Sequence, residues 1–301
     1  MSSALPESPD YFAVVPRDRF DIPGRSGGLL DALRWHYLLR LLVRTGVTTR
    51  YRNSVLGWTW SYVRPAAQFL VFFIVLGIFL KLNHGIENYA VYLFSGIVVI
   101  NLFSEAYKNA TTSIVNNAPL VRKVYLPRQL FAVSAVIVAF VHFLPQVALL
   151  LVVCVFLGWL AHISILSVLA VLAGMLIVVM FALGLGLLFG ALNVRYRDSE
   201  NIVELLLLLA TWASPVLYYW TMVRDAFEAV PWLFDLYLLN PITQAVELFH
   251  FGFWYPISGT GLPLPPNLGL NTLWTFLIAV VMLWAGQTVF RRLEGRFAQD
   301  L

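Results

Sequence analysis

Asn116–Arg128, with the sequence NNAPLVRKVYLPR, lies between two long apolar runs. Pro119 and Pro127 bound a segment long enough for about two helical turns. A polar stretch this short is usually only a connector, but this one combines cations with apolar residues, as a contact surface does. We therefore interpret it as the place where another protein pushes on this chain. Its candidate contact residues are Asn117, Leu120, Val121, Arg122, Lys123, Tyr125, Pro127 and Arg128.

Composition places these apolar runs in a membrane. Hydrophobic residues make up 60% of the 301 residues, charged residues make up only 12%, and the mean hydropathy is +0.78. Soluble domains carry about 25% charged residues, so an integral membrane protein is predicted. Cys154 is the one cysteine and lies within an apolar run, which excludes a disulfide framework and a cysteine-based metal site.

Six apolar runs approach the length of about 20 residues that crosses the hydrocarbon core of a bilayer. The predicted fold class is therefore an all-α membrane protein with six transmembrane helices, which form one domain over residues 47–301. The expected spans cover residues 65–80, 89–107, 130–160, 163–192, 202–220 and 270–290.

Three segments outside the spans have patterns of their own. Residues 1–27 are rich in turn-forming residues and are expected to form an irregular cytoplasmic tail. Residues 28–46 set leucines at helical spacing against a basic face, which predicts an amphipathic interfacial helix on the inner membrane surface; a helix packed on protein is the alternative. Residues 227–256 hold two apolar runs too short to span, which predicts two short re-entrant helices on the outer side.

The charge distribution predicts the orientation. Of the 20 Lys and Arg residues, all but Lys81 and Arg224 fall before the first span, in the connections after the second and fourth spans, or in the C-terminal tail. Cytoplasmic loops carry the excess of Lys and Arg, so both termini of this multi-pass protein are expected on the cytoplasmic side of the cell membrane. The pI of about 9.2 follows from the same bias, and no nucleic-acid partner is expected.

Sequence motifs for several kinds of chemistry are missing. None of the three lysines follows a glycine, so there is no P-loop, and the five histidines form no i, i+4 pair that would suit a metal. The serine motif G-x-S-x-G and the zinc motif H-E-x-x-H are also missing, so we expect no catalytic site. Gly186 and Gly190 form a G-x-x-x-G pair, which predicts close helix packing rather than a phosphate site.

Charged residues are rare in the expected spans, although transporters driven by protons or ions place them there. His142 is the one titratable residue in the middle of spans 1, 3, 4 and 6. Glu105 is expected to pair locally with Lys108, and Glu200 and Glu204 stand at the favourable N-terminus of the fifth span. Energy for transport would then come from another subunit, which favours a motor-driven permease.

Aromatic residues gather near the ends of the spans. They have two interpretations, an interfacial belt or a path on which sugar rings stack and slide. The candidate channel or gate residues are Trp58, Trp60, Trp212, Tyr218, Tyr219, Trp220, Trp232 and Tyr237.

Five short stretches carry a family resemblance. They are RYRNSVLGWTW (50–60), LVRKVYLPR (120–128), NVRYRD (193–198), SPVLY (214–218) and NPIT (240–243). In this order, over about residues 30–290, they resemble the permease subunit of ABC-2-type polysaccharide exporters, the Wzm-like and teichoic-acid-export group. Within that group the chain looks most like the actinobacterial galactan exporters of cell-wall assembly.

The resemblance implies a homodimer bound to two copies of an ABC ATP-binding subunit. ATP and Mg²⁺ would be bound by that subunit, with no cofactor in this chain. Residues 117–128 would be a coupling helix in a cleft of the ATPase, spans 1 and 5 would line the path, and the outer helices would form a gate. The cargo would be a polyprenyl-diphosphate-linked polysaccharide of the O-antigen, teichoic-acid or galactan kind.

Three arginines near the start of the first span are candidates for binding the pyrophosphate of such a cargo. Arg50, Arg52 and Arg64 would do so by charge-assisted hydrogen bonds, and anchoring at the membrane surface is the alternative. Two other functions stay open: an ion-coupled flippase of lipid-linked glycans and an intramembrane enzyme acting on lipid-linked sugars. The first needs titratable groups inside the spans, and the second needs a carboxylate or histidine site at the interface.

Overall fold

The computed structural model describes the chain in seven stretches, and every regular element in them is a helix, which confirms the all-α fold class. Among the predicted features, the tail 1–27, Arg52 and Tyr125 lie outside the described residues, and the side chain of Arg50 is not described. The described stretches are residues 28–29, 34–50, 54–55, 57–81, 86–123, 126–259 and 263–301.

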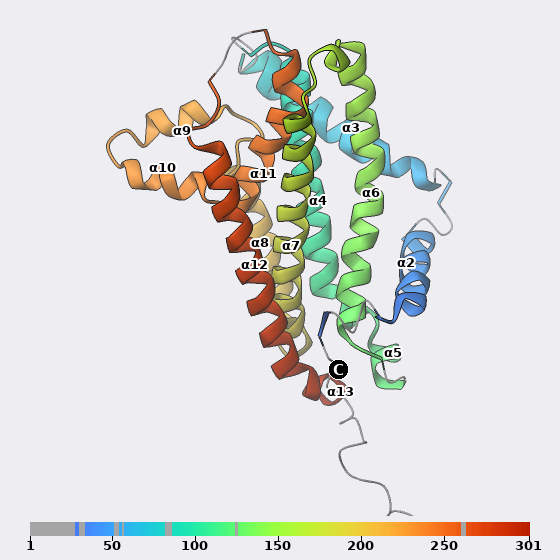
Figure 1. The fold of residues 1–301 in the computed structure, drawn as a ribbon. Coiled ribbons are helices and arrows are strands. Elements are labelled where there is room, and N and C mark those ends of the chain that lie inside the picture. The colour runs from blue at the N-terminus through green and yellow to red at the C-terminus, as the bar shows by residue number, and fades with distance from the viewer. Residues whose placement is uncertain are drawn as a thin grey trace, which may run out of the picture.

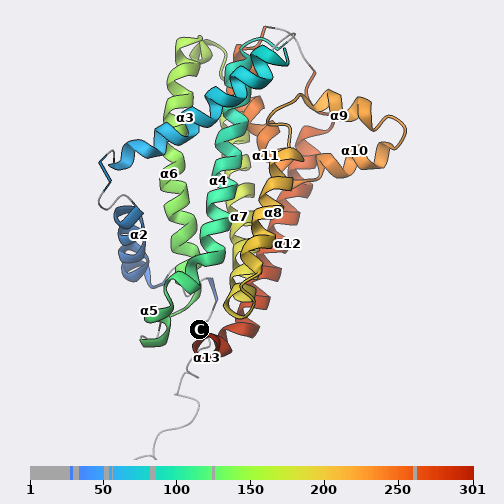
Figure 2. The same ribbon diagram turned by 180° about the vertical axis from the view of Figure 1, so that it is seen from behind.

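Long helices run side by side through the molecule (Figures 1 and 2). In the described residues, five helices are long and apolar enough to cross a membrane, and they match five of the six expected spans. They are α3 with its π-helical continuation (Gly57–Phe79), α4 (Tyr89–Asn116), α6 (Gln129–Phe156), α7 (Ile165–Arg195) and α12 (Leu268–Leu293). Arg64, which we expected ahead of the first span, lies inside helix α3 (Trp60–Phe72).

The expected fifth span is shorter than the sequence suggested. Helix α8 (Ser199–Trp212) has 14 residues, about 21 Å at 1.5 Å per residue, whereas the hydrocarbon core measures about 30 Å. Residues 213–219 leave the helical path, and a short helix, α9 (Trp220–Ala226), follows them. Pro215 lies in this break and, having no backbone N–H, favours the interruption. The count of six spans stays a prediction.

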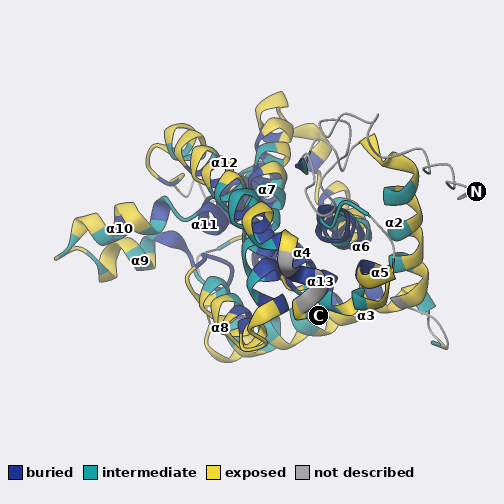
Figure 3. Cartoon of the chain, turned by 90° about the horizontal axis from the view of Figure 1, so that it is seen from below, coloured by how far each residue is buried: buried dark blue, intermediate teal, exposed yellow. Residues whose placement is uncertain are grey.

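The N-terminal helix packs on protein along one side. Helix α2 (His36–Arg50) contacts α6. A view along the bundle shows α2 from the side, so its axis is inclined to the long helices (Figure 3). A Cβ atom on Gly46 would lie 2.9 Å from a methyl group of Val138, so glycine permits this close contact. The helix extends to Arg50, past its predicted end at residue 46. In this last part the hydroxyl of Thr48 donates a hydrogen bond to the carbonyl of Arg44 at 2.9 Å.

Glycines on α7 allow its two neighbours to approach closely. Gly186 and Gly190 face Ala110 of α4, so the predicted close packing of this G-x-x-x-G pair is confirmed. On the other side, a Cβ on Gly184 would lie 2.7 Å from the backbone nitrogen of Leu283, and a Cβ on Gly286 would collide with the carbonyl of Gly184. Helix α7 thus joins α4 and α12 by backbone contact.

Three short helices follow α8 on the side away from the C-terminus. The two predicted outer helices correspond to α10 (Pro231–Leu238) and α11 (Pro241–Phe249), and α9 is an addition to the prediction. Every residue of α11 is buried, whereas α9 and α10 project from the bundle as a hairpin (Figures 1 and 3). A π-helical turn, His250–Trp254, continues α11 and is followed by a 3₁₀ turn, Tyr255–Ile257.

Tyr92 of α4 holds the break after α8 in place. Its buried hydroxyl donates to the carbonyls of Tyr218 at 2.7 Å and of Pro215 at 3.0 Å. Its ring stacks on His250 with 3.9 Å between centroids. One side chain therefore connects α4, the interruption and the continuation of α11.

We expect Gly286→Ala to destabilise the protein by about 1–3 kcal/mol, the usual effect of overpacking, because the new methyl group meets backbone rather than a movable side chain. Thermal unfolding of the purified protein measures this. Gly269→Ala is the matched control, since a Cβ at that position of the same helix has no neighbour within 4 Å. Equal melting temperatures for the two variants would contradict the prediction.

Tyr92→Phe should also lower stability, by about 1–3 kcal/mol, because it removes the donor that the carbonyls of Pro215 and Tyr218 share. Hydrogen exchange should rise at residues 213–219 more than in α7. Tyr62→Phe, on the exposed side of α3, is the control and should change neither quantity.

Candidate functional site

A polar cavity of about 540 Å³ opens between α3, α4 and α6, with one residue of α8 at its edge. Hydroxyl, amide and charged side chains dominate its wall, which is unusual inside a bundle of this composition. The lining residues are Ser54, Trp60, Ser61, Arg64, Pro65, Gln68, Asn101, Ser104, Glu105, Lys108, Asn109, His142, Gln146 and Leu207.

A hydrogen-bonded series of side chains joins α4 to α6 along this wall. The amide of Asn101 donates to Gln146 Oε1 at 3.2 Å, and Gln146 donates to the carbonyl of His142 at 3.3 Å. His142 Nδ1 lies 2.7 Å from Glu105 Oε1, with the histidine side chain only 2% exposed. His142 stands midway along α6, so an acid–histidine pair lies inside the bundle.

The pairing predicted between Glu105 and Lys108 is wrong. Lys108 instead reaches Glu204 of α8 at 2.6 Å, and Glu105 takes His142 as its partner. Helix α8 lies beside α4 and offers a carboxylate on the side toward which Lys108 points, whereas Glu105 faces α6. Glu200 also finds a specific partner, because it accepts a hydrogen bond from Asn193 at 2.8 Å.

Of the three arginines considered for pyrophosphate binding, the structure places Arg64 in the cavity wall. Its guanidinium carbon is 6.0 Å from the ring centroid of Trp60, one helical turn earlier. Trp60 is itself 39% exposed and lines the cavity. The cavity therefore has a cation and an indole ring at one end and the amides of α4 and α6 along its wall.

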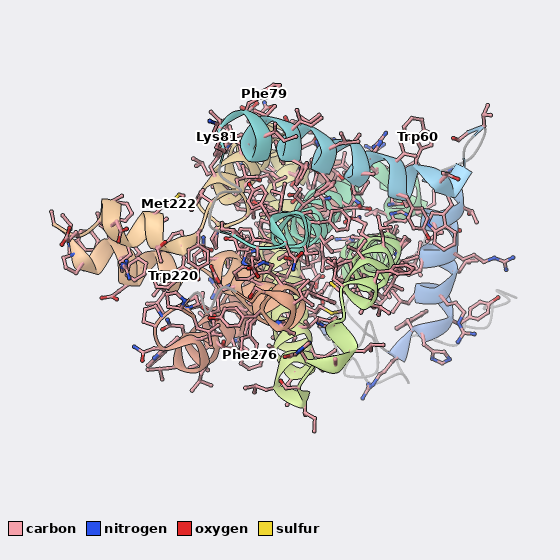
Figure 4. All side chains as sticks on the ribbon, turned by 90° about the horizontal axis from the view of Figure 1, so that it is seen from above. Trp60, Phe79, Lys81, Trp220, Met222 and Phe276 are labelled. Atoms are coloured by element: carbon pink, nitrogen blue, oxygen red, sulfur yellow. The ribbon has the colours of Figure 1, made fainter. Side chains whose placement is uncertain are left out.

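The candidate aromatic residues do not form one path. Trp212, Tyr218 and Tyr237 come together in a second, apolar cavity of about 750 Å³ beneath the α9–α10 hairpin. Figure 4 shows Trp60 on one side of the molecule and Trp220 and Met222 on the other.

The remaining candidate aromatics divide into buried and exposed residues. Tyr219 and Trp220 are buried, and both donate to the carbonyl of Pro263, at 2.6 and 3.3 Å, so they hold the segment that precedes α12. Trp58 and Trp232 are 52% and 63% exposed and line neither cavity.

The basic stretch between the second and third spans contains helix α5 (Ala118–Lys123), at the same end of the molecule as the C-terminus (Figure 1). Asn117 ends α4 and donates to the carbonyl of Ser113 at 2.7 Å. Val121 is buried in the core, while Arg122 and Lys123 are exposed. The helix thus presents two adjacent cations outward from an apolar anchor.

The other candidate contact residues differ in exposure. Leu120 is 42% exposed, but Pro127 and Arg128 are partly buried. The guanidinium carbon of Arg128 lies 5.6 Å from the ring centroid of Phe297 in the C-terminal segment. Among the candidate contact residues that the structure describes, Leu120, Arg122 and Lys123 are therefore the exposed ones.

The predictions from the sequence do not include the amide residues of the cavity, although the sequence holds a signal for them. Asn101, Glu105 and Lys108 follow one another at i, i+4 and i+7 on α4, and His142 and Gln146 stand at i, i+4 on α6. Such spacing puts each set on one face of its helix. A polar face on each of two consecutive spans predicts that the two faces meet.

Comparison with known proteins agrees with this architecture. The chain is 28% identical over 271 residues to the O-antigen export system permease protein RfbA of Myxococcus xanthus, covering 90% of this chain and 98% of that protein. It is 24% identical over 264 residues to a protein of the same name from Klebsiella pneumoniae, covering 88% and 95%. The polysialic acid transport protein KpsM of Escherichia coli is 21% identical over 204 residues, covering 67% and 75%.

A family match covers both the polar cavity and helix α5. The description "ABC-2 type transporter" matches residues 37–254, which is more than half of the chain and includes α2 through the π-helical turn after α11. The membrane-length helices, the short helices between α8 and α12 and the curated relatives point the same way. The chain belongs to the ABC-2 type transporter family.

Proposed function

We propose that this chain is the membrane-spanning subunit of an ATP-driven exporter that carries a polyprenyl-diphosphate-linked polysaccharide from the cytoplasm to the outer side of the cell membrane. The names of its relatives, which concern O-antigen export and polysialic acid transport, support a polysaccharide cargo. The single observation that carries the proposal is the polar cavity between α3, α4 and α6.

The cavity opens on a side of the molecule that cannot simply face lipid. Charged side chains within membrane spans are costly and almost always face the bundle interior or a water-filled cavity, and Arg64, Glu105 and Lys108 all line this cavity. The neighbouring α8 exposes a row of apolar residues (Figure 3), among them Leu205, Leu209 and Trp212. A second copy of the chain covering this side would bury that row and enclose the cavity in a shared path, which supports a homodimer.

Energy for export would come from a separate ATP-binding subunit with bound ATP and Mg²⁺. The chain has no P-loop lysine, and α5 presents Arg122 and Lys123 at the end where the C-terminus lies (Figure 1). That end would be cytoplasmic, with both termini inside, because it also carries Arg291 and Arg292 at the end of α12. Two ATPase copies would then bind one homodimer, one at each α5.

The pair of Glu105 and His142 supports a second candidate function. A titratable pair inside the bundle is what a proton-coupled flippase of lipid-linked glycans requires. A transport assay in proteoliposomes that contain the chain and a lipid-linked glycan distinguishes the two mechanisms. Transport that needs ATP and the ATPase supports the exporter, whereas transport driven by a pH gradient without ATP supports the flippase.

Depleting the chain in cells should make the cytoplasmic lipid-linked glycan accumulate, and that glycan identifies the cargo.

We expect Arg122→Ala/Lys123→Ala to reduce binding of the ATP-binding subunit by about ten- to a hundredfold, as for the loss of two exposed contacts that are buried on complex formation. Affinity purification and stimulated ATP hydrolysis measure this, with membrane insertion unchanged. Arg291→Ala/Arg292→Ala is the matched control, because it also removes two adjacent exposed cations from the same end. Unchanged complex formation in the α5 variant would refute the assignment of α5.

Asn101→Leu/Gln146→Leu should lower glycan export by about tenfold or more while leaving the melting temperature nearly unchanged, because replacing both partners of a hydrogen bond by apolar groups is close to neutral for stability. Export per ATPase complex in proteoliposomes measures the effect. Full export by a folded double variant would show that the cargo does not use this wall.

A further inference from the structure

We propose that the C-terminal segment, Glu294–Leu301, ties the partner-facing helix α5 to the last span, α12, with Phe297 as the positioning residue. The segment consists of a 3₁₀ turn, Glu294–Arg296, and the short helix α13, Phe297–Asp300. This inference rests on the proposed function, since it assumes that an ATP-binding subunit acts on α5. It adds a route by which that action reaches the bundle.

The segment folds back under the bundle instead of leaving it. Leu293, Phe297 and Leu301 recur every four residues and pack against the core, and the backbone N–H of Leu301 donates to the carbonyl of Phe297 at 3.1 Å. Glu294 and Phe297 are each only 1% exposed. Figures 1 and 2 show α13 turned beneath the ends of the long helices, near α5.

Phe297 lies between a residue of α12 and a residue of the basic stretch. Its ring meets Phe290 edge to face, with 5.3 Å between centroids and 90° between planes. The guanidinium carbon of Arg128 lies 5.6 Å from the centroid of the same ring. Both geometries are attractive because the ring has a negative face and a positive edge. One side chain therefore joins the connection after α5 to α12.

Helix α5 is held at both of its ends. It begins at Ala118, directly after Asn117, whose side chain is bonded to the last turn of α4, and Val121 anchors it in the core. Beyond its last residue, the chain returns to the bundle at Arg128 just before α6, and α13 contacts α5 directly. A displacement of α5 relative to α4 would therefore act on the C-terminal segment through the direct contact of α5 with α13, the helix that carries Phe297.

Helix α12 can pass such a displacement onward. At Gly184 and Gly286 the backbones of α7 and α12 touch, so the two helices have no side-chain layer between them to absorb a shift. Helix α7 in turn meets α4, which carries Asn101 and Glu105 of the polar cavity. The contacts thus form a continuous series from α5 through Phe297 and α12 to the cavity wall.

The simpler interpretation is that Phe297 only fills space in the core. Phe297→Leu separates the two, because leucine keeps an apolar side chain at the position but has no ring for Arg128. Phe297→Tyr adds a hydroxyl but keeps the ring that Arg128 and Phe290 contact. Phe143→Leu is the matched control, since Phe143 is also 1% exposed and meets aromatic rings, but none of the cations that the structure describes lies over its ring.

The test uses the complete complex of permease and ATPase in proteoliposomes with a lipid-linked glycan, and the quantity measured is glycan exported per ATP hydrolysed. We expect Phe297→Leu to lower this ratio by about two- to fivefold, the loss that corresponds to one cation–π contact. Complex formation and the maximal ATPase rate should stay unchanged, and Phe297→Tyr and Phe143→Leu should keep the original ratio. If Phe297 has only a structural role, Phe297→Leu should lower the melting temperature, but the folded complex should export as much glycan per ATP hydrolysed as the original. That result would overturn the inference.

Arg128→Gln provides an independent arm if Phe297→Leu does not fold, because it should lower the same ratio from the other side of the contact. Where both variants fold, their combination should be no worse than either alone, as expected for two residues that act through one contact. An additive loss would overturn the inference. ATP-independent export by the unmodified complex would instead refute the proposed function, so the two failures are distinguishable.

Discussion

Backbone contact along α7 is the constraint on which the remaining structure depends. Lipid offers helices no hydrophobic reason to associate, so close approach through small residues supplies much of the attraction. Gly186 and Gly190 bring α4 against α7, while Gly184 and Gly286 bring in α12. With α4 fixed on this side, its polar residues face away from α7 and toward α3, α6 and α8. The polar cavity is therefore a consequence of where the glycines lie.

The sequence predicts the long helices well, because apolar runs of membrane length have few other solutions. Residues 202–220 are mostly apolar, and hydropathy does not distinguish a continuous span from an interrupted one, so the hydropathy pattern does not predict the break after α8 even though Pro215 lies in it. Tyr92, which is 123 residues away from Pro215, holds that break. Glu105 is a similar case: local helical spacing predicts Lys108 as its partner, but the actual partner, His142, comes from another helix.

Position in the fold separates residues that look alike in the sequence. The candidate aromatics were chosen for their chemistry, yet Trp60 lines a polar cavity, Trp212 lines an apolar one and Trp220 is buried as a donor to Pro263. An indole ring can stack on a sugar only where its face is open, so burial decides among them. The polar cavity, with its amides and the partly exposed indole of Trp60, has the chemistry that a hydroxyl-rich cargo requires, and the apolar cavity does not.

The cations of the basic stretch also differ in their exposure, and this difference bears on how a displacement of α5 would reach the bundle. Arg122 and Lys123 point outward and are free to meet a partner's surface, whereas Arg128 points inward onto Phe297. A helix that transmits the motion of a bound partner must be fixed to the bundle on its inner side, because otherwise the motion would only bend the loop. The buried valine at the middle of α5 and the arginine beyond its end provide that inner side. Asn117, before α5, contacts the last turn of α4, and Arg128, beyond its end, contacts Phe297 in the extension of α12. A displacement of α5 would therefore shift α4 and α12 relative to each other.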